Sequence, residues 1–197
     1  TINQYTDDIL RAIYKKQPDV IGFSCYIWNI QMVKAVLPAI RKILPDCTLF
    51  AGGPEVSFGS TAFLQENTLD FIIRGEGEIP LTEAMCRLLS GESYEDVRGL
   101  TVRLADGRIQ ENPDADVPDM SEVPFPYAEL DSLKNRIIYY ETMRGCPFHC
   151  QYCLSGGGSK VRFRPLPMVF KELDLFLSQR VPQVKFMDRT FNCNREY

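Results

Sequence analysis

Short apolar runs alternate with helical patterns through the first hundred residues, and this alternation constrains the fold more than any other feature of the chain. Each run is continuous in apolar residues, as in a strand that is buried on both faces. Strands separated by about 10 to 15 helical residues form right-handed βαβ units and pair in parallel. The sequence therefore predicts a doubly wound, parallel-sheet α/β domain over residues 1–111. Its predicted strands are residues 19–24, 48–51 and 69–73, and its predicted helices are residues 7–16, 29–44, 60–66 and 80–89.

The chain changes character after these elements. An Asp-Gly pair between alternating apolar residues predicts a β-hairpin of residues 100–104 and 108–110. Residues 112–135 contain four prolines and several acids, which predicts an extended linker. Residues 136–197 then carry strand, helix and strand patterns, which predict the opening β-α-β of a second, larger domain. These patterns occupy residues 136–143, 165–180 and 184–187.

Composition argues against several classes of function. The formal net charge of −4 gives no electrostatic basis for binding nucleic acid or an anionic membrane. No apolar run approaches the length of a membrane span, and the first residues have no signal-peptide pattern. Seven scattered cysteines favour reduced thiols and a cytoplasmic location. Because the sequence begins at Thr1 and both ends look cut, we expect a fragment whose unpaired strand edges favour self-association.

Three cysteines, Cys146, Cys150 and Cys153, follow a strand-like run with three and then two residues between them. A loop of this spacing can wrap one corner of an iron–sulfur cluster, and three thiolates leave one iron open to an outside ligand. Zinc is the alternative, because Cys150 and Cys153 form half of a zinc site, with His149 or Cys146 as a further ligand. A second well-spaced pair is missing, since His149 is the only histidine. The spacing therefore favours an iron–sulfur site over zinc or a disulfide framework.

This C-x3-C-x2-C pattern, with Tyr152 just before the third cysteine, resembles the cluster motif of radical S-adenosylmethionine (SAM) enzymes. The resemblance implies that Cys146, Cys150 and Cys153 hold a 4Fe-4S cluster whose open iron binds SAM, and that Tyr152 lies against the adenine. It also implies cleavage of SAM to a 5'-deoxyadenosyl radical, an electron donor such as flavodoxin or ferredoxin, and a small-molecule substrate. Cores of that family are partial TIM-type barrels, so residues 136–197 would be the first, truncated β-α-β of one.

A second resemblance involves the first domain. The order Pro-Asp-Val-Ile-Gly-Phe-Ser, Gly-Gly-Pro-Glu and Gly-Glu-Gly-Glu resembles the flavodoxin-like, cobalamin-binding domain that precedes many radical SAM cores. It implies that Ser24, Gly52 and Gly53 line the channel for the nucleotide tail of cobalamin. Without the resemblance, the glycines suit tight strand-to-helix turns. The family's Asp-x-His-x-x-Gly motif, whose histidine can ligate cobalt, is absent from the sequence and would precede Thr1, so cobalamin use stays open.

Charged residues beyond the cysteines have two interpretations each. Asp188 follows a predicted strand, where radical SAM enzymes usually carry a Gly-Gly-Glu-like motif, and the resemblance implies that Asp188 holds the amino group of SAM. Its alternative role is a helix cap or a turn. Lys160, Arg162 and Arg164 alternate with apolar residues, and we expect a solvated strand edge there. The alternative is an arginine that meets the SAM carboxylate or an acidic substrate.

The chain as a whole looks closest to the bacterial group labelled anaerobic magnesium-protoporphyrin IX monomethyl ester cyclase, which implies an oxidative ring closure. The prediction is a fragment of a cytoplasmic radical SAM oxidoreductase or transferase, with or without cobalamin. We expect no turnover from the isolated chain, and the sequence does not identify the substrate. The alternative from another class is a zinc-bearing or scaffold α/β module that binds without catalysis.

Overall fold

The computed structural model describes residues 5–127, 136–153 and 160–197. The chain divides into two compact units, Thr1–Val117 and Pro118–Tyr197, called unit 1 and unit 2 below. Each unit has a hydrophobic core of its own. The boundary falls inside the stretch that the prolines mark as a linker, of which residues 128–135 lie outside the described part of the chain.

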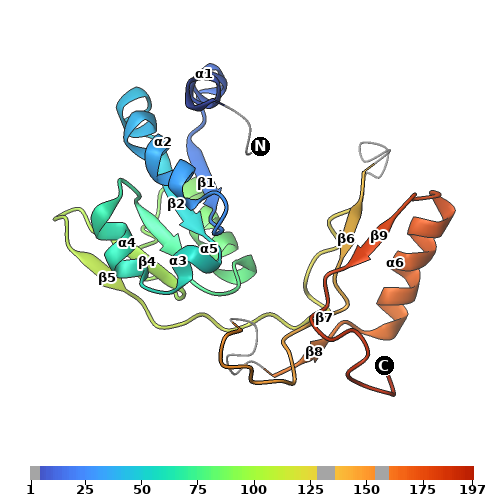
Figure 1. Ribbon diagram of the computed structural model, residues 1–197. Helices are drawn as coiled ribbons and strands as arrows, with labels where there is room; N and C mark the ends of the chain where they lie inside the picture. Colours follow the sequence, from blue (N-terminus) through green and yellow to red (C-terminus); the bar gives the residue numbers. More distant parts are fainter. Residues whose placement is uncertain (1–4, 128–135, 154–159) are drawn as a thin grey trace. The chain divides into compact units, whose positions relative to one another are not determined.

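Unit 1 contains the predicted alternation of strands and helices (Figure 1). Its elements are, in chain order, α1 (Thr6–Lys16), β1 (Val20–Ser24), α2 (Ile30–Ile43), β2 (Thr48–Gly52), α3 (Pro54–Ser57), α4 (Ser60–Glu66), β3 (Phe71–Ile73), α5 (Glu78–Ser90), β4 (Leu100–Arg103) and β5 (Ile109–Glu111). Every element predicted within residues 1–111 is present to within about two residues at each end, and the short α3 is additional.

The strands of unit 1 form one sheet in the order β1-β2-β3-β4-β5. Strands β1, β2 and β3 are parallel, whereas β4 and β5 are antiparallel additions at one side. The antiparallel pairing of β4 with β5 confirms the predicted hairpin. The predicted α/β class, with a sheet whose first three strands are parallel, is therefore confirmed.

Helices cover both faces of this sheet, because successive side chains of a buried strand point to opposite faces. Leu49 and Ala51 of β2 and Ile72 of β3 pack in one cluster with residues of α1, α2 and α4. Phe71 and Ile73 of β3 point the other way, into a cluster with α5 and β4. The sheet is thus the middle of three layers, which explains why its central strands are apolar on both faces.

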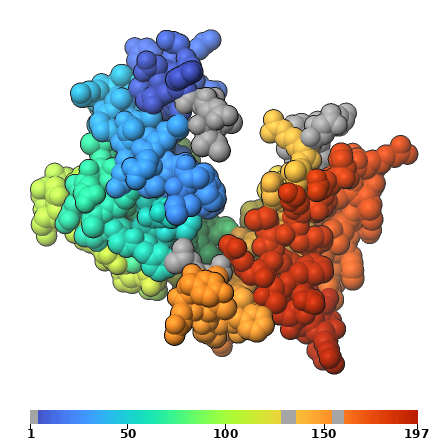
Figure 2. Space-filling view, in the orientation of Figure 1, coloured from blue at the N-terminus to red at the C-terminus, as the bar shows by residue number. Residues whose placement is uncertain are grey.

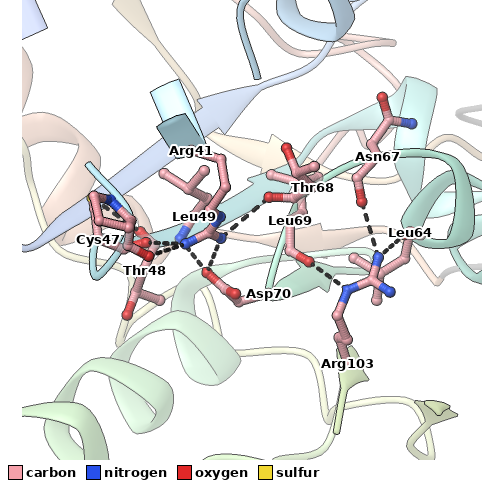
Figure 3. A network of polar contacts seen from close by, with 11 residues as sticks. Arg41, Cys47, Thr48, Leu49, Leu64, Asn67, Thr68, Leu69, Asp70 and Arg103 are labelled. Atoms are coloured by element: carbon pink, nitrogen blue, oxygen red, sulfur yellow. Dashed lines mark hydrogen bonds and ion pairs between the residues drawn. The ribbon is translucent and has the colours of Figure 1, made fainter. Parts of the chain in front are cut away.

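Figure 3 shows the polar network at the amino ends of β2 and β3. Asp70, just before β3, accepts hydrogen bonds through one carboxylate oxygen from the Leu49 backbone N–H at 2.6 Å and from Arg41 Nη2 at 2.7 Å. Arg41 projects from α2 and also donates to the backbone carbonyls of Cys47 and Thr68 at 2.8 and 3.2 Å. One carboxylate and one guanidinium therefore connect a helix and the starts of two strands.

Arg103 plays a similar part at the end of β4 (Figure 3). Its Nε donates to the Leu69 carbonyl at 3.2 Å, and its Nη2 donates to the carbonyls of Leu64 and Asn67. These carbonyls belong to the last turn of α4 and to the connection that follows it, where helix carbonyls lack partners within the helix. Arg103 therefore fixes the connection between α4 and β3.

Unit 2 is built on a β-α-β segment. Its elements are β6 (Ile138–Tyr140), β7 (Met143–Arg144), β8 (Arg162–Phe163), α6 (Leu166–Ser178) and β9 (Val184–Phe186). Strands β6 and β9 pair in parallel, and α6 packs on them through Val169 and Phe176. The predicted opening β-α-β is present, and the partial TIM-type barrel remains a prediction.

The predicted strand 136–143 is split into two strands that pair with different partners. β6 pairs with β9, and β7 pairs antiparallel with β8. The break occurs at Thr142, whose backbone N–H donates to Asp188 Oδ1 at 2.8 Å. At this point the Asp188 side chain, and not a neighbouring strand, accepts the backbone hydrogen bond, so β6 and β7 are separate strands.

Parts of the predicted linker are bound to the two units. The side-chain amide of Asn112 donates to two backbone carbonyls of unit 1 at 2.8 Å. Further on, Arg164 Nη1 donates to the carbonyls of Met120 and Val123, both at 2.8 Å, and Met120 is buried. Buried guanidinium groups need several acceptors, and an extended segment offers free backbone carbonyls.

Helices also form much of the surface of each unit. Figure 2 shows α1, at the blue end of the chain, and α6, in orange and red, at the surfaces of their units. All residues of α1 are at least partly exposed. Among the helices in the described residues, none has the length and apolar character that crossing a membrane requires.

We predict that Arg41→Met destabilises unit 1 by about 2 kcal/mol, because Asp70 loses its ion-pair partner and several backbone carbonyls lose a donor. The measurement is urea unfolding followed by the fluorescence of Trp28, the only tryptophan, which lies in unit 1. Arg11→Met is the control, because Arg11 and its partner Asp8 are both exposed. Equal unfolding midpoints for the two variants would contradict the role given to Arg41.

Candidate functional site

The carboxyl ends of β1, β2 and β3 bring the predicted cobalamin-lining residues together. Ser24 pairs with Gly52 in the β1–β2 register, and Gly53 follows directly. Ser24 is exposed, and the two glycines are half-buried. In open α/β sheets, ligands bind beyond this edge of the strands. The structure therefore places Ser24, Gly52 and Gly53 at one edge, and their contact with a cofactor remains a prediction.

Gly53 is required by a close approach of two backbone segments. Its φ of 106° suits glycine, and a Cβ there would lie 2.6 Å from the carbonyl oxygen of Cys25. The Cys25 backbone N–H donates to the Gly52 carbonyl at 2.7 Å, and the Glu55 N–H donates to the Cys25 carbonyl at 3.3 Å. The tight-turn interpretation thus accounts for Gly53 by geometry.

A third segment joins this edge through the hydroxyl of Ser57, at the end of α3. Ser57 Oγ donates to the Gly53 carbonyl at 2.9 Å and accepts from the Gly75 backbone N–H at 3.2 Å. Gly75 follows β3 and opens the Gly-Glu-Gly-Glu segment. The three motifs found in the sequence are therefore connected by hydrogen bonds.

Tyr26 and Trp28 form an aromatic platform in the loop after β1. Their rings stack with centroids 4.6 Å apart and planes 6° apart, and 64% of Trp28 remains exposed. Asn29 holds the loop, because its Oδ1 accepts from the Tyr26 N–H at 2.8 Å and its Nδ2 donates to the Ser24 carbonyl at 2.7 Å. Neighbouring Ile27 is 75% exposed. A rigid loop that presents aromatic surface to solvent is typical of a binding site.

The sequence predicts that residues 24–28 lie at the ligand-binding edge of the sheet, but it does not predict that the two rings stack. The signal available was a Tyr-x-Trp pattern directly after a strand that ends at the ligand-binding edge. Stacking of the two rings depends on the conformation of the loop, which the Asn29 side chain sets. A residue pattern alone does not determine such a conformation.

Cys25 is the first residue of this loop, and its thiol is buried and protonated. Burial, with a smaller contribution from the charge of Glu55, raises the pKa of Cys25 to about 11. The thiol therefore stays neutral at physiological pH and packs as a small apolar group. It packs in the hydrophobic core of unit 1 and does not act as a thiolate.

The cysteine loop leaves β7 through Gly145, whose φ is 93° and whose Cβ position would lie 3.0 Å from the carbonyl of Lys160. Cys146 is half-buried, whereas Cys150 and Cys153 are exposed. Figure 2 shows this segment, in orange, at the surface. The Tyr152 side chain is 92% exposed.

Free thiols with this spacing fit an iron–sulfur cluster by their chemistry and number. The arrangement of these thiols in the structure does not fit a cluster. Among the described residues, no three or more His, Cys, Asp or Glu side chains lie close enough together to hold a metal ion. His149 is exposed on the same loop. The residue types thus fit the cluster, and holding it requires a rearrangement of the loop.

Asp188 contacts the chain immediately before this loop. Its Oδ1 accepts from the backbone N–H groups of Thr142 and Met143 at 2.8 and 3.1 Å, and its Oδ2 accepts from the Thr142 hydroxyl. These contacts join Asp188 to a segment about 46 residues earlier, so they are neither a helix cap nor a hydrogen bond within a local turn. Contact of Asp188 with the SAM amino group remains a prediction.

Arg164 departs from the predicted solvated edge. Only 4% of it is exposed, and it forms a bidentate ion pair with Glu172 of α6 at 2.8 and 2.6 Å. Lys160, four residues earlier, is exposed. The prediction is therefore wrong for Arg164, because a carboxylate and backbone carbonyls replace water as its acceptors.

Comparison with protein families gives one match to unit 1. Residues 1–85 match the family model of the B12 binding domain. This range contains β1 to β3 and the segments of Ser24, Gly52–Gly53 and Gly75 that meet at the carboxyl ends of these strands.

Curated relatives are mostly methyltransferases. An uncharacterized methyltransferase of Pyrococcus horikoshii is 27% identical, over 96% of this chain and 43% of that protein. The cobalamin-dependent radical SAM methyltransferase TokK of Streptomyces tokunonensis is 26% identical, over 89% of this chain and 28% of that protein. The hopanoid C-3 methylase of Methylococcus capsulatus is 30% identical, over 74% of this chain and 30% of that protein. The chain thus spans less than half the length of these relatives.

Solved structures share the fold. The cobalamin-dependent SAM radical enzyme OxsB, with aqua-cobalamin and SAM bound, gives a TM-score of 0.76 at 22% identity, over 95% of this chain and 28% of that chain. The radical SAM methyltransferase TsrM of Kitasatospora setae gives 0.74 at 18% identity, over 95% of this chain and 40% of that chain.

The comparisons change the expected reaction class. The anaerobic magnesium-protoporphyrin IX monomethyl ester cyclase of Synechocystis is 26% identical over only 58% of this chain and 24% of that protein. The methyltransferases match more of the chain. The chain is thus related to cobalamin-dependent radical SAM methyltransferases, and the relatives favour a transferase over an oxidoreductase.

We predict that the folding stability falls by roughly 2 to 3 kcal/mol as pH rises from 9 to 11, because the raised pKa of Cys25 means that the folded chain binds this proton more tightly. This contribution is fully present below pH 9 and is lost as pH rises through the folded pKa. Urea unfolding of the wild type and Cys25→Ala across this range measures it. Cys25→Ala should lose less stability than the wild type, and Cys86→Ala, an exposed cysteine, is the control. Parallel profiles for wild type and Cys25→Ala would contradict the prediction.

Proposed function

We propose that this chain is the cofactor-bearing part of a cobalamin-dependent radical SAM methyltransferase. Unit 1 binds cobalamin, and unit 2 contributes the loop that holds a 4Fe-4S cluster and SAM. The observation that carries the proposal is the B12 binding domain match over residues 1–85, which includes the edge where Ser24, Gly52 and Gly53 meet.

Cobalamin would be held at the carboxyl edge of the parallel strands. The exposed Ser24 hydroxyl offers a polar contact, and the glycine pair lets a ligand approach the backbone closely. The aromatic platform supplies a flat apolar surface, with Trp28 outermost by exposure. A macrocycle with a nucleotide tail presents both polar groups and flat surface, so the two parts of the edge complement it.

Histidine ligation of cobalt is not needed in this proposal. The only histidine of the sequence is His149, on the cysteine loop of unit 2. Affinity would therefore come from contacts along the tail and from stacking on the platform. Such contacts act through shape and desolvation.

In unit 2, Cys146, Cys150 and Cys153 would ligate the cluster, and Tyr152 would lie against the adenine of SAM. When bound, the cluster with SAM supplies one-electron and radical chemistry, and cobalamin supplies a methyl-carrying cobalt. The chain's own residues bind, orient and shield these groups. The substrate is an unidentified small molecule, and a flavodoxin or ferredoxin supplies electrons.

We predict that Trp28→Ala weakens the binding of hydroxocobalamin about 3- to 10-fold, because it removes one stacking surface. Equilibrium dialysis with detection of the cobalamin colour measures the affinity. Trp28→Phe should keep most of it, and Phe170→Ala, an exposed aromatic residue of α6, is the control. No binding by the wild type would refute cobalamin binding by this chain, and unchanged affinity in Trp28→Ala would refute the role of the platform.

We predict that anaerobic reconstitution with iron and sulfide gives the broad visible absorbance of an iron–sulfur cluster, and that Cys150→Ala abolishes it. Iron and sulfide analysis per chain completes the measurement. Cys86→Ala, which removes an exposed cysteine of unit 1, should behave like the wild type. Tightly bound zinc with no iron would favour the zinc-bearing module instead.

A further inference from the structure

The last ten residues of the chain wrap the base of the cysteine loop. We call residues 188–197 the clamp; its contacts come from Asp188, Thr190, Cys193 and Tyr197. Asp188 holds the join between β6 and β7, where it accepts hydrogen bonds from both backbone N–H groups of Thr142 and Met143. An ionised carboxylate that accepts backbone N–H groups makes strong hydrogen bonds. The chain therefore enters the cysteine loop from a fixed position.

The other end of the clamp holds the same join from its carbonyl side. The hydroxyl of Tyr197 lies 3.1 Å from the Thr142 carbonyl and 2.6 Å from the Arg164 carbonyl. The Arg164 backbone N–H donates to the same Thr142 carbonyl at 2.8 Å. The Tyr197 ring packs on Phe163 of β8, with centroids 4.6 Å apart. Thr142 is thus bound at its N–H, its hydroxyl and its carbonyl.

Between these ends, the clamp reaches the sulfur of the first cysteine. Thr190 Oγ1 lies 3.4 Å from Cys146 Sγ, within hydrogen-bond distance for sulfur. Cys193 Sγ lies 3.8 Å from the sulfur of Met143, and its backbone N–H donates to the Thr190 carbonyl at 3.1 Å. The chain is therefore anchored by Asp188 before Thr190 and by Cys193 after it.

From these contacts we propose that Asp188 and Thr190 are positioning residues for the iron–sulfur cluster. Asp188 fixes the start of the loop, and Thr190 orients Cys146 and donates a hydrogen bond to its sulfur when that sulfur is a thiolate. Cys146 is then the preset ligand, around which the exposed Cys150 and Cys153 close. This inference rests on the proposed cluster site. It gives Asp188 a role through the backbone of Thr142 and Met143, in place of contact with SAM.

The proposal has a chemical consequence for the cluster. A hydrogen bond to a ligand sulfur stabilises the more negative, reduced state, and so raises the reduction potential. Removal of the Thr190 hydroxyl therefore lowers the potential while leaving the three thiols in place. A residue that only supported the fold would not shift the potential in this way.

The first test uses the 197-residue chain without iron. Asp188→Ala should speed backbone hydrogen exchange at Thr142 and Met143 at least tenfold, measured by mass spectrometry, because both N–H groups lose their acceptor. Asp188→Asn keeps one oxygen and should exchange more slowly than the alanine variant. Asp174→Ala, on the exposed side of α6, is the control. Exchange in Asp188→Ala equal to that of the wild type would overturn the role of Asp188.

The second test uses the reconstituted chain. Thr190→Val should bind as much iron as the wild type, with a lower midpoint potential and a shifted electron paramagnetic resonance signal, and Thr190→Ser should restore both. Identical potentials in wild type and Thr190→Val would overturn the role of Thr190. If the wild type takes up no iron, the proposed cluster site fails, and with it the role of Thr190, while hydrogen exchange still decides whether Asp188 holds the loop. Because Thr190→Val is nearly isosteric, it serves even if Asp188→Ala does not fold.

Discussion

The hydrogen-bonded ion pair between Arg41 and Asp70 is the interaction on which the arrangement of unit 1 depends. The Asp70 carboxylate also accepts the Leu49 N–H, so α2, β2 and β3 meet at one oxygen atom (Figure 3). Parallel strands that are aligned at their amino ends also end together, about one strand length away. The network therefore helps to align the carboxyl ends of β2 and β3, where Gly52 and Gly75 lie, although it contributes no atom to that edge.

Unit 2 uses a buried ion pair in a comparable way. Glu172 of α6 accepts two hydrogen bonds from Arg164 and one from the Tyr140 hydroxyl, so the helix is tied to β6 and to the residue that follows β8. Burial and this hydrogen bond raise the pKa of Tyr140 far above its ordinary value, so the hydroxyl remains a donor. Breaking such a pair would leave an uncompensated buried charge, which is costly. The pair therefore holds α6 in the one position where both partners can meet. The clamp then links this frame to the cysteine loop.

Periodicity and turn residues predicted most of the local structure. Apolar runs such as 48–51 located the strands, and the Asp-Gly pair located the hairpin. These signals act within a few residues, so they can be read along the chain. The split of strand 136–143 could not be read in this way, because Asp188, some 46 residues later, supplies the acceptor that interrupts the ladder.

The same distinction between local signals and contacts of distant residues applies to the candidate sites. The sequence by itself determined which chemical groups are present: three cysteines with cluster spacing, a glycine pair after a strand, and Ser24 at the end of another. Only the tertiary structure decided that Trp28 stacks on Tyr26, that Arg164 is buried against Glu172, and that Thr190 reaches Cys146. The physical reason is that spacing controls neighbours within one loop, whereas partners distant in the sequence are chosen by how the sheet and helices pack.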